Sequence, residues 1–177
     1  MENPEQSDDL TAATDIIDSV VGLTPEDPLF AVRHARRKVS EATQGSYDLF
    51  FETVNRGLAL QDRLLVAWYA CVLSKAQALG QHYQDRLASV PFDATVGAAI
   101  ENDHVDQLAP SPLKAMLVFT RKLIVDPVHG DKAALQELKA SGIATPDVVT
   151  LAQLIAFISY QIRLAAGLQA LKALESQ

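Results

Sequence analysis

The chain has 177 residues, 49% of them hydrophobic, and a formal net charge of −7. This length and apolar share suit one domain with a sizeable core and exclude general disorder. Nucleic-acid-binding domains are usually basic, so an acidic chain argues against nucleic acid as a partner. The single cysteine, Cys71, excludes an internal disulfide.

The N-terminal segment is acidic and lacks the apolar stretch of a secretory signal. The longest apolar run, 148–166, is interrupted by glutamine and arginine, which argues against a membrane span. We therefore expect a cytoplasmic protein with no membrane partner. Residues 1–23 are expected to form a tail with a short helix, and residues 24–177 a single domain.

The composition favours an all-α fold, because Ala, Leu and Gln are common and no apolar–polar alternation marks a strand. Residues 15–21 predict a short helix that ends at Gly22. Asp27 as N-cap and Pro28 at the first position predict the start of the next helix. Its apolar residues recur at helical spacing and predict one buried face: Leu29, Val32, Ala35 and Val39.

Gly45 and Ser46 are expected to break this pattern, and a further helix is expected to begin at Tyr47 and to close at residues 55–57. The basic run RHARRK at 33–38 is interpreted as a solvated helical face. A docking patch for an acidic surface or an anionic ligand is the alternative interpretation of this run.

Residues 62–87 form the least interrupted apolar stretch in the first half of the chain and contain its only tryptophan. They predict two helices that meet at a polar break near Ser74 and Lys75, and Pro91 stops the second helix. Apolar residues at steps of three and four predict a wide buried stripe on the first helix: Leu64, Leu65, Trp68, Cys71 and Val72.

The second half of the chain carries clearer boundary signals. Residues 93–101 predict a short helix, and Ser111 with Pro112 predicts the start of a helix that runs to residue 124. Asp131 is expected to cap another helix, which ends at Gly142.

The last and longest predicted helix opens at Thr145 and runs to about Leu174. Its middle is apolar nearly all the way round, so it must be covered on most sides. We expect the domain core to cover one side and another subunit to cover the other. The sequence therefore predicts a homo-oligomer that aggregates, rather than forming a stable monomer, when it is diluted.

Two ordered series of short motifs carry a family resemblance. The first is GL at 57–58, DRLLVA at 62–67 and QHY at 81–83, and the second is FTRKL at 119–123 through YQIRLAAGL at 160–168. Together they resemble the peroxidase-related branch of the alkylhydroperoxidase D-like, carboxymuconolactone decarboxylase superfamily. The resemblance implies an all-α alkylhydroperoxidase D-like helical bundle that assembles into dimers, trimers or hexamers, and it makes a peroxidase-related paralogue a candidate partner.

The active members of that family use a Cys-x-x-Cys pair at the start of a helix, with a glutamate upstream and a histidine after the pair. When Arg63 is matched to the family arginine, the cysteine positions become Ala76 and Leu79, and the glutamate position becomes Leu64. The histidine position becomes Tyr83, one residue after His82. Thiol peroxidase chemistry needs an attacking and a resolving thiol, and neither is present at these positions.

Cys71 lies on the apolar stripe of the preceding helix, so we expect it to pack in the core with a raised pKa. The leading hypothesis is a family member without the redox pair, acting as a non-redox binding or assembly module linked to a peroxidase-related system. A true alkylhydroperoxidase is a second alternative, which requires an accessible Cys71.

A thiol-independent, decarboxylase-like enzyme with a pocket around His82 is the first alternative, with Arg63 and Tyr83 as further catalytic candidates. The other interpretation of His82 is a half-exposed structural histidine near a subunit boundary. No cofactor is implied by either hypothesis.

Two other polar features invite a functional interpretation. Arg163 lies in the most apolar helix, and we expect it to pair with Asp62 or Asp147 rather than to bind an anion. Metal-ligand residue types gather at 101–106, but we expect a solvated turn there and no metal site. The residues of that cluster are Glu101, Asp103, His104 and Asp106.

Overall fold

The computed structural model describes residues 15–51 and 57–175. The described chain is all-α, as predicted, with no strand in these two ranges. Its elements are α1 (Ile16–Val21), α2 (Pro28–His34), α3 (Arg37–Phe51), α4 (Leu60–Leu73), α5 (Gln77–Leu87), α6 (Ala94–Glu101), η1 (Val105–Gln107), α7 (Pro112–Val125), η2 (Pro127–His129), α8 (Lys132–Ala140) and α9 (Thr145–Glu175).

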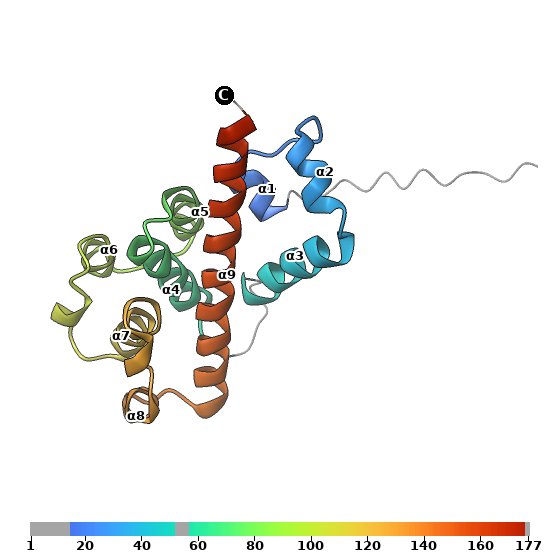
Figure 1. Ribbon diagram of the computed structural model, residues 1–177. Helices are drawn as coiled ribbons and strands as arrows, with labels where there is room; N and C mark the ends of the chain where they lie inside the picture. The colour runs from blue at the N-terminus through green and yellow to red at the C-terminus, as the bar shows by residue number, and fades with distance from the viewer. Residues whose placement is uncertain (1–14, 52–56, 176–177) are drawn as a thin grey trace, which may run out of the picture.

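The long helix α9 runs through the molecule, with α1–α3 on one side and α4–α8 on the other (Figure 1). Its buried face packs mainly on α4 and α1. The sequence analysis expected another subunit to cover the second side of α9. In the structure, α1–α3 of the same chain cover much of that side. One stripe of α9 keeps exposed apolar side chains: Val149, Tyr160, Leu171 and Leu174.

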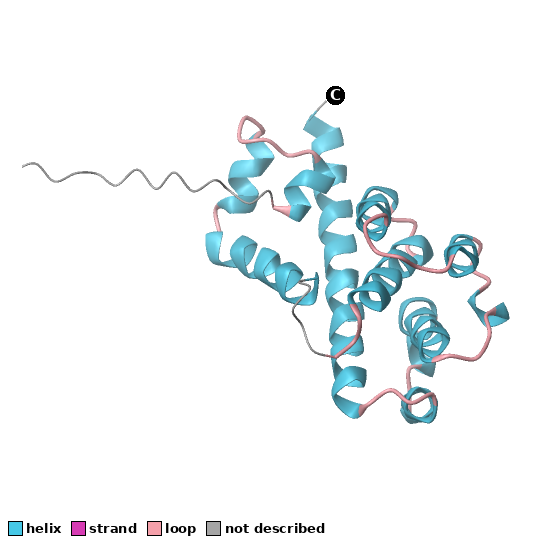
Figure 2. Cartoon of the chain, turned by 180° about the vertical axis from the view of Figure 1, so that it is seen from behind, coloured by secondary structure: helices cyan, strands magenta, loops and turns pink. Residues whose placement is uncertain are grey.

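Helix α4 is the centre of the core, in agreement with the buried stripe that the sequence predicts on the first helix of residues 62–87. Every residue from Arg63 to Cys71 is buried, because α3, α5, α6, α7 and α9 all pack on α4. Figure 2 shows the same arrangement from behind, with loops joining the helices.

Capping residues fix several helix boundaries, and Gly22, Ser111 and Asp131 act as the sequence suggested. Asp15 accepts hydrogen bonds from Ile17 N and Asp18 N, and Gly22 ends α1 in the left-handed conformation. Ser111 and Asp131 cap α7 and α8 with their side chains. These side chains satisfy amide groups that lack a partner at a helix start, which fixes where each helix begins.

The region between Asp27 and Phe51 differs from the prediction. The Asp27 side chain accepts a hydrogen bond from Thr24 N instead of capping α2. Helix α2 ends at His34, and Val32 and Val39 are 69% and 45% exposed, so the predicted continuous buried face is wrong.

Gly45 does not break a helix, because α3 continues through it. Glycine costs a helix about 1 kcal/mol relative to alanine, and buried anchors on either side of Gly45, Thr43 and Tyr47, offset that cost. The predicted closure at 55–57 lies, apart from Gly57, outside the described residues, as does most of the predicted N-terminal tail.

Helix α9 is long and apolar enough to cross a bilayer by length and composition, a criterion that the core helix of a soluble protein also meets. Within the described chain, α9 lies in the middle of the helical layers and its buried residues face other helices (Figure 1).

Candidate functional site: the corner between α4 and α5

Helices α4 and α5 meet at a tight corner, at the polar break that the sequence predicted. Backbone hydrogen bonds from Ser74 N to Ala70 O and from Ala76 N to Cys71 O close the end of α4. Lys75 adopts the left-handed conformation at φ 56°, which costs a side-chain-bearing residue about 1 kcal/mol. Gly80 allows close approach, because a Cβ there would lie 3.3 Å from the Cβ of Cys71.

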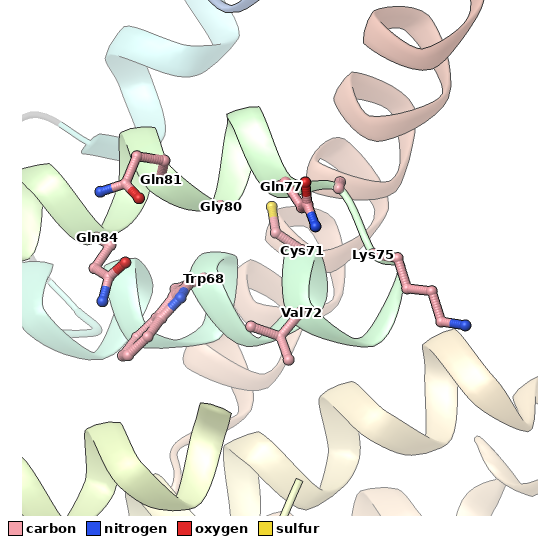
Figure 3. A pocket seen from close by; sticks show the side chains of 9 residues that line it. Trp68, Cys71, Val72, Lys75, Gln77, Gly80, Gln81 and Gln84 are labelled. Atoms are coloured by element: carbon pink, nitrogen blue, oxygen red, sulfur yellow. The ribbon is translucent and has the colours of Figure 1, made fainter. Parts of the chain in front are cut away.

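An open cavity of about 570 Å³ lies at this corner (Figure 3). We call it the α4–α5 pocket. Of the residues that the structure describes, Lys75 is the only charged one that lines it, and the rest of the described lining is apolar or carries uncharged amides. The lining residues are Trp68, Cys71, Val72, Lys75, Ala76, Gln77, Gly80, Gln81 and Gln84.

The indole of Trp68 is held between two helices that approach it through glycines. Its Cδ1 atom would be 4.0 Å from a Cβ at Gly80 on α5, and its six-membered ring would be 3.7 Å from a Cβ at Gly97 on α6. The residue is 4% exposed. Its N–H makes no hydrogen bond to any described residue, yet the nitrogen is not sealed from solvent. Figure 3 shows this nitrogen turned toward the space between α4 and α5.

The glutamines of α5 supply acceptors around the same cavity. Gln81 Nε2 donates to Asp85 Oδ1 at 2.7 Å, and Gln84 Nε2 lies 3.4 Å from Glu101 Oε1. Because the amide nitrogens are directed to these carboxylates, the amide oxygens remain available. The pocket therefore combines an indole donor, amide acceptors and one cation.

Cys71 forms part of the pocket floor, but its side chain belongs to the core. The residue is 1% exposed, and burial raises the pKa of its thiol far above the ordinary range. A thiol in this state is not a nucleophile at neutral pH. The prediction that Cys71 packs in the core is confirmed.

His82 lies on a different side of α5 from the pocket lining, in a polar network with α3. Tyr47 Oη is 2.6 Å from His82 Nε2, and Arg86 Nη1 donates to the same phenol oxygen at 2.6 Å. Since the phenol accepts from Arg86, its own hydrogen is directed to His82 Nε2, which leaves the imidazole hydrogen on Nδ1. Burial, and then the Arg86 charge, lower the pKa of His82 to about 4, so the ring is neutral at pH 7.

The other two candidates, Arg63 and Tyr83, are buried structural residues. Arg63 Nη1 donates to Phe50 O, and burial followed by the charge of Arg86 lowers the pKa of Arg63. Tyr83 Oη donates to Gln161 Oε1 at 2.5 Å and joins α5 to α9. Neither lines the α4–α5 pocket.

The sequence analysis missed the residues that complete these two sites. Tyr47 and Arg86 were not singled out, because the contact between α3 and α5 is not encoded in local spacing. Gln77, Gln81 and Gln84 carried a usable signal, since steps of four and three place them on one face of a helix.

The expectation that Arg163 is buried in an ion pair is wrong. Arg163 is exposed and donates to Ser159 O, its own helix backbone, and no ion pair with Asp62 or Asp147 forms in the described chain. The reason is that Arg163 lies on the outer side of α9. Asp62 is partly buried, which raises the pKa of its carboxyl group.

The basic run at 33–38 is only in part a solvated face. The Arg33 side chain is 5% exposed and bridges Asp15 at 2.9 Å and Asp18 at 3.0 Å. His34 Nε2 lies 2.8 Å from Asp18 as well. These contacts tie α2 to α1.

The carboxylates of the 101–106 cluster face protein groups. Arg121 lies 2.5 Å from Asp106 and 3.7 Å from Asp103, and Tyr69 Oη donates to Asp103. Within ranges 15–51 and 57–175, no group of three or more potential ligands is placed to hold a metal ion.

Comparison with known proteins adds no relationship to this geometry. No protein-family model matches the chain, and no curated protein is similar to it. The class that the fold defines is an all-α helical protein.

Proposed function

We propose that this protein is a non-redox binding and assembly module of the alkylhydroperoxidase D-like type, linked to a peroxidase-related system. The α4–α5 pocket is its ligand site. The ligand class is a small neutral or singly anionic molecule that carries a hydrogen-bond acceptor. The protein acts in the cytoplasm as a homo-oligomer.

The observation that carries this proposal is the N–H of Trp68 at the pocket wall, which has no hydrogen-bond partner among the residues that the structure describes. Because this N–H is open to the pocket, a bound molecule with an acceptor can take the place of water there, at a net gain of about 0.5–1.5 kcal/mol. The cavity, about 570 Å³, falls in the usual range of small-molecule sites. Lys75, as the only charged group of the lining, favours an anion over a cation.

Trp68 is the only tryptophan, so its fluorescence reports directly on this pocket. We expect a saturable change in emission when benzoate or benzamide, both of which carry a carbonyl acceptor, is titrated into the protein. Replacing Gln84 by leucine should weaken binding about tenfold, the effect of one lost hydrogen bond of about 1.4 kcal/mol. Lys75→Gln should weaken the binding of benzoate but not that of benzamide.

Gln107→Leu, at the exposed end of η1, is the matched control and should leave both titrations unchanged. If neither compound gives a saturable signal, the proposed ligand class is wrong. If Gln107→Leu weakens binding as much as Gln84→Leu does, the site lies elsewhere.

The peroxidase alternative depends on the accessibility of Cys71. We expect the thiol to resist a disulfide reagent such as dithionitrobenzoate in the native protein and to react fully in denaturant, because it is 1% exposed. Turnover of cumene hydroperoxide that disappears in Cys71→Ser would support the alternative and contradict the proposal.

The enzyme alternative is favoured by one observation, the Arg86–Tyr47–His82 network. A neutral imidazole held beside a phenol and a guanidinium is a group that general base catalysis can use. Hydrolysis of 4-nitrophenyl acetate, compared between the wild type and His82→Gln, tests for such reactivity. Equal rates in the two proteins count against an enzymatic His82.

A further inference from the structure

Helix α8 and the first turns of α9 enclose an open groove of about 520 Å³. We call it the α8–α9 groove. Its floor includes Leu135 and Val149, which are 38% and 52% exposed. Among the described residues, Lys132 and Lys139 are the only charged ones that line it, and none of its described lining is acidic. The groove thus offers an apolar surface together with two cations.

Helix α8 fixes the distance between the two lysines. They are seven residues apart on α8, which places them on one face of the helix at a separation of about 10.5 Å along its axis. Neither forms an ion pair or a hydrogen bond with another described residue. Two copies of this groove placed face to face would bring like charges together, so its occupant must be acidic.

Helix α3 has the complementary pattern. Among the helices of the described chain, it alone exposes two carboxylates, Glu41 and Asp48, which are also seven residues apart. Leu49, which is 65% exposed, lies beside them. Glu41 already pairs with Arg37 at 2.5 Å, but both side chains are largely exposed. Such surface pairs contribute little and can be exchanged.

We propose that α3 of one copy of the protein docks in the α8–α9 groove of a second copy, with Glu41 and Asp48 facing Lys132 and Lys139. This inference rests on the proposed self-association and names its surfaces. Figures 1 and 2 show α3 and α8 on opposite sides of α9, so a chain does not fill its own groove with α3. The contact is either reciprocated about a twofold axis or continued into a ring.

Charge reversal tests the contact. Lys132→Glu with Lys139→Glu, and separately Glu41→Lys with Asp48→Lys, should each lower the association constant at least about tenfold, because attraction becomes repulsion. The chain with all four changes should recover the wild-type mass. An equimolar mixture of the two double variants should also associate, since the acidic groove of one accepts the basic α3 of the other.

The mass of each sample is measured by light scattering and its association constant by sedimentation, with helical content checked by circular dichroism. Lys75→Glu and Asp85→Lys, on the corner and on α5, are the matched single controls and should not change the mass. If neither double variant changes the association constant of the oligomer, this contact is wrong, but the proposed self-association is not contradicted. If the wild type is a monomer at every concentration, both the contact and the proposed self-association are wrong. If the two double variants associate more weakly but neither the fourfold variant nor the mixture recovers, the contact is wrong.

Discussion

The Nε2 atom of His82 accepts a hydrogen bond from a phenol and faces no carboxylate at that atom. This places the ring in its neutral form, with a pKa lowered to about 4. A histidine in this state is a hydrogen-bond acceptor that connects α3 to α5. Protonation would remove the acceptor and set a cation beside Arg86.

Acid should therefore weaken the fold through His82. The folded-state pKa lies below the ordinary value of 6.5, so this contribution is complete above about pH 6.5 and is lost as the pH falls toward 4. Because the side chain is partly exposed, we expect only about 1–2 kcal/mol. The thermal midpoint of the wild type should fall more between pH 7 and 4.5 than that of His82→Gln.

His129→Gln is the control for this measurement, since the His129 side chain is exposed and its Nδ1 atom lies 2.6 Å from Asp126 Oδ2. It should keep the acid sensitivity of the wild type. Equal acid sensitivity in His82→Gln and the wild type would contradict the assignment.

Only those residues of the candidate site could be predicted whose placement follows from spacing along a single helix. Gln77, Gln81 and Gln84 follow from helical spacing, and the burial of Cys71 follows from its apolar stripe. The partners of His82 come from Tyr47 and Arg86, which are joined by packing between separate helices. No local pattern encodes that contact, so the sequence could name His82 but not its role.

At the scale of elements, α1 and α2 are held together by buried charge. Arg33 is 5% exposed at its side chain and bridges Asp15 and Asp18. Removal of one partner of a buried ion pair leaves uncompensated charge, which costs about 3–5 kcal/mol. Arg33→Met should therefore lower the free energy of unfolding by about 3 kcal/mol in a denaturant titration.

The matched control is Arg37→Met, because Arg37 forms a pair with Glu41 in which the side chains are 77% and 56% exposed. Its cost should stay below about 1 kcal/mol. Adding Asp18→Leu to Arg33→Met should recover part of the loss. Similar costs for the two arginine variants would show that the bridge to α1 contributes little.

The same elements explain which parts of the fold could be predicted. Capping side chains act within three residues, so the starts of α7 and α8 were predicted correctly from Ser111 and Asp131. The division between α2 and α3 depends on how Arg33 and Tyr47 pack on other helices. The prediction from helical spacing treated the two helices as one and placed Val32 on its buried face, whereas Val32 is exposed.

At the scale of the molecule, stability should be distributed unevenly. Helix α4 is buried along its length and packs on five other helices, whereas Leu29 is the only buried residue of α2. Amide exchange in α4 should require global unfolding, and exchange in α2 should proceed by local opening. Hydrogen-exchange mass spectrometry measures both in one sample.

Leu65→Ala, in the core of α4, should cost about 2–5 kcal/mol and lower the protection of α4 by the same free energy. The exchange of α2 should not change, because its opening leaves α4 folded. Equal protection of α2 and α4 in the wild type would contradict this distribution.

The two glycines that flank Trp68 each lie close to a second side chain. A methyl group at Gly97 would lie 3.1 Å from Phe92, and one at Gly80 would lie 3.3 Å from the Cβ atom of Cys71, whereas both would stay at ordinary contact distance from the indole. Neither glycine can therefore become alanine unless Phe92 or Cys71 shifts. Among relatives of this protein, positions 92 and 97 should covary, and so should positions 71 and 80, with alanine entering at 97 or 80 where residue 92 or 71 has become smaller.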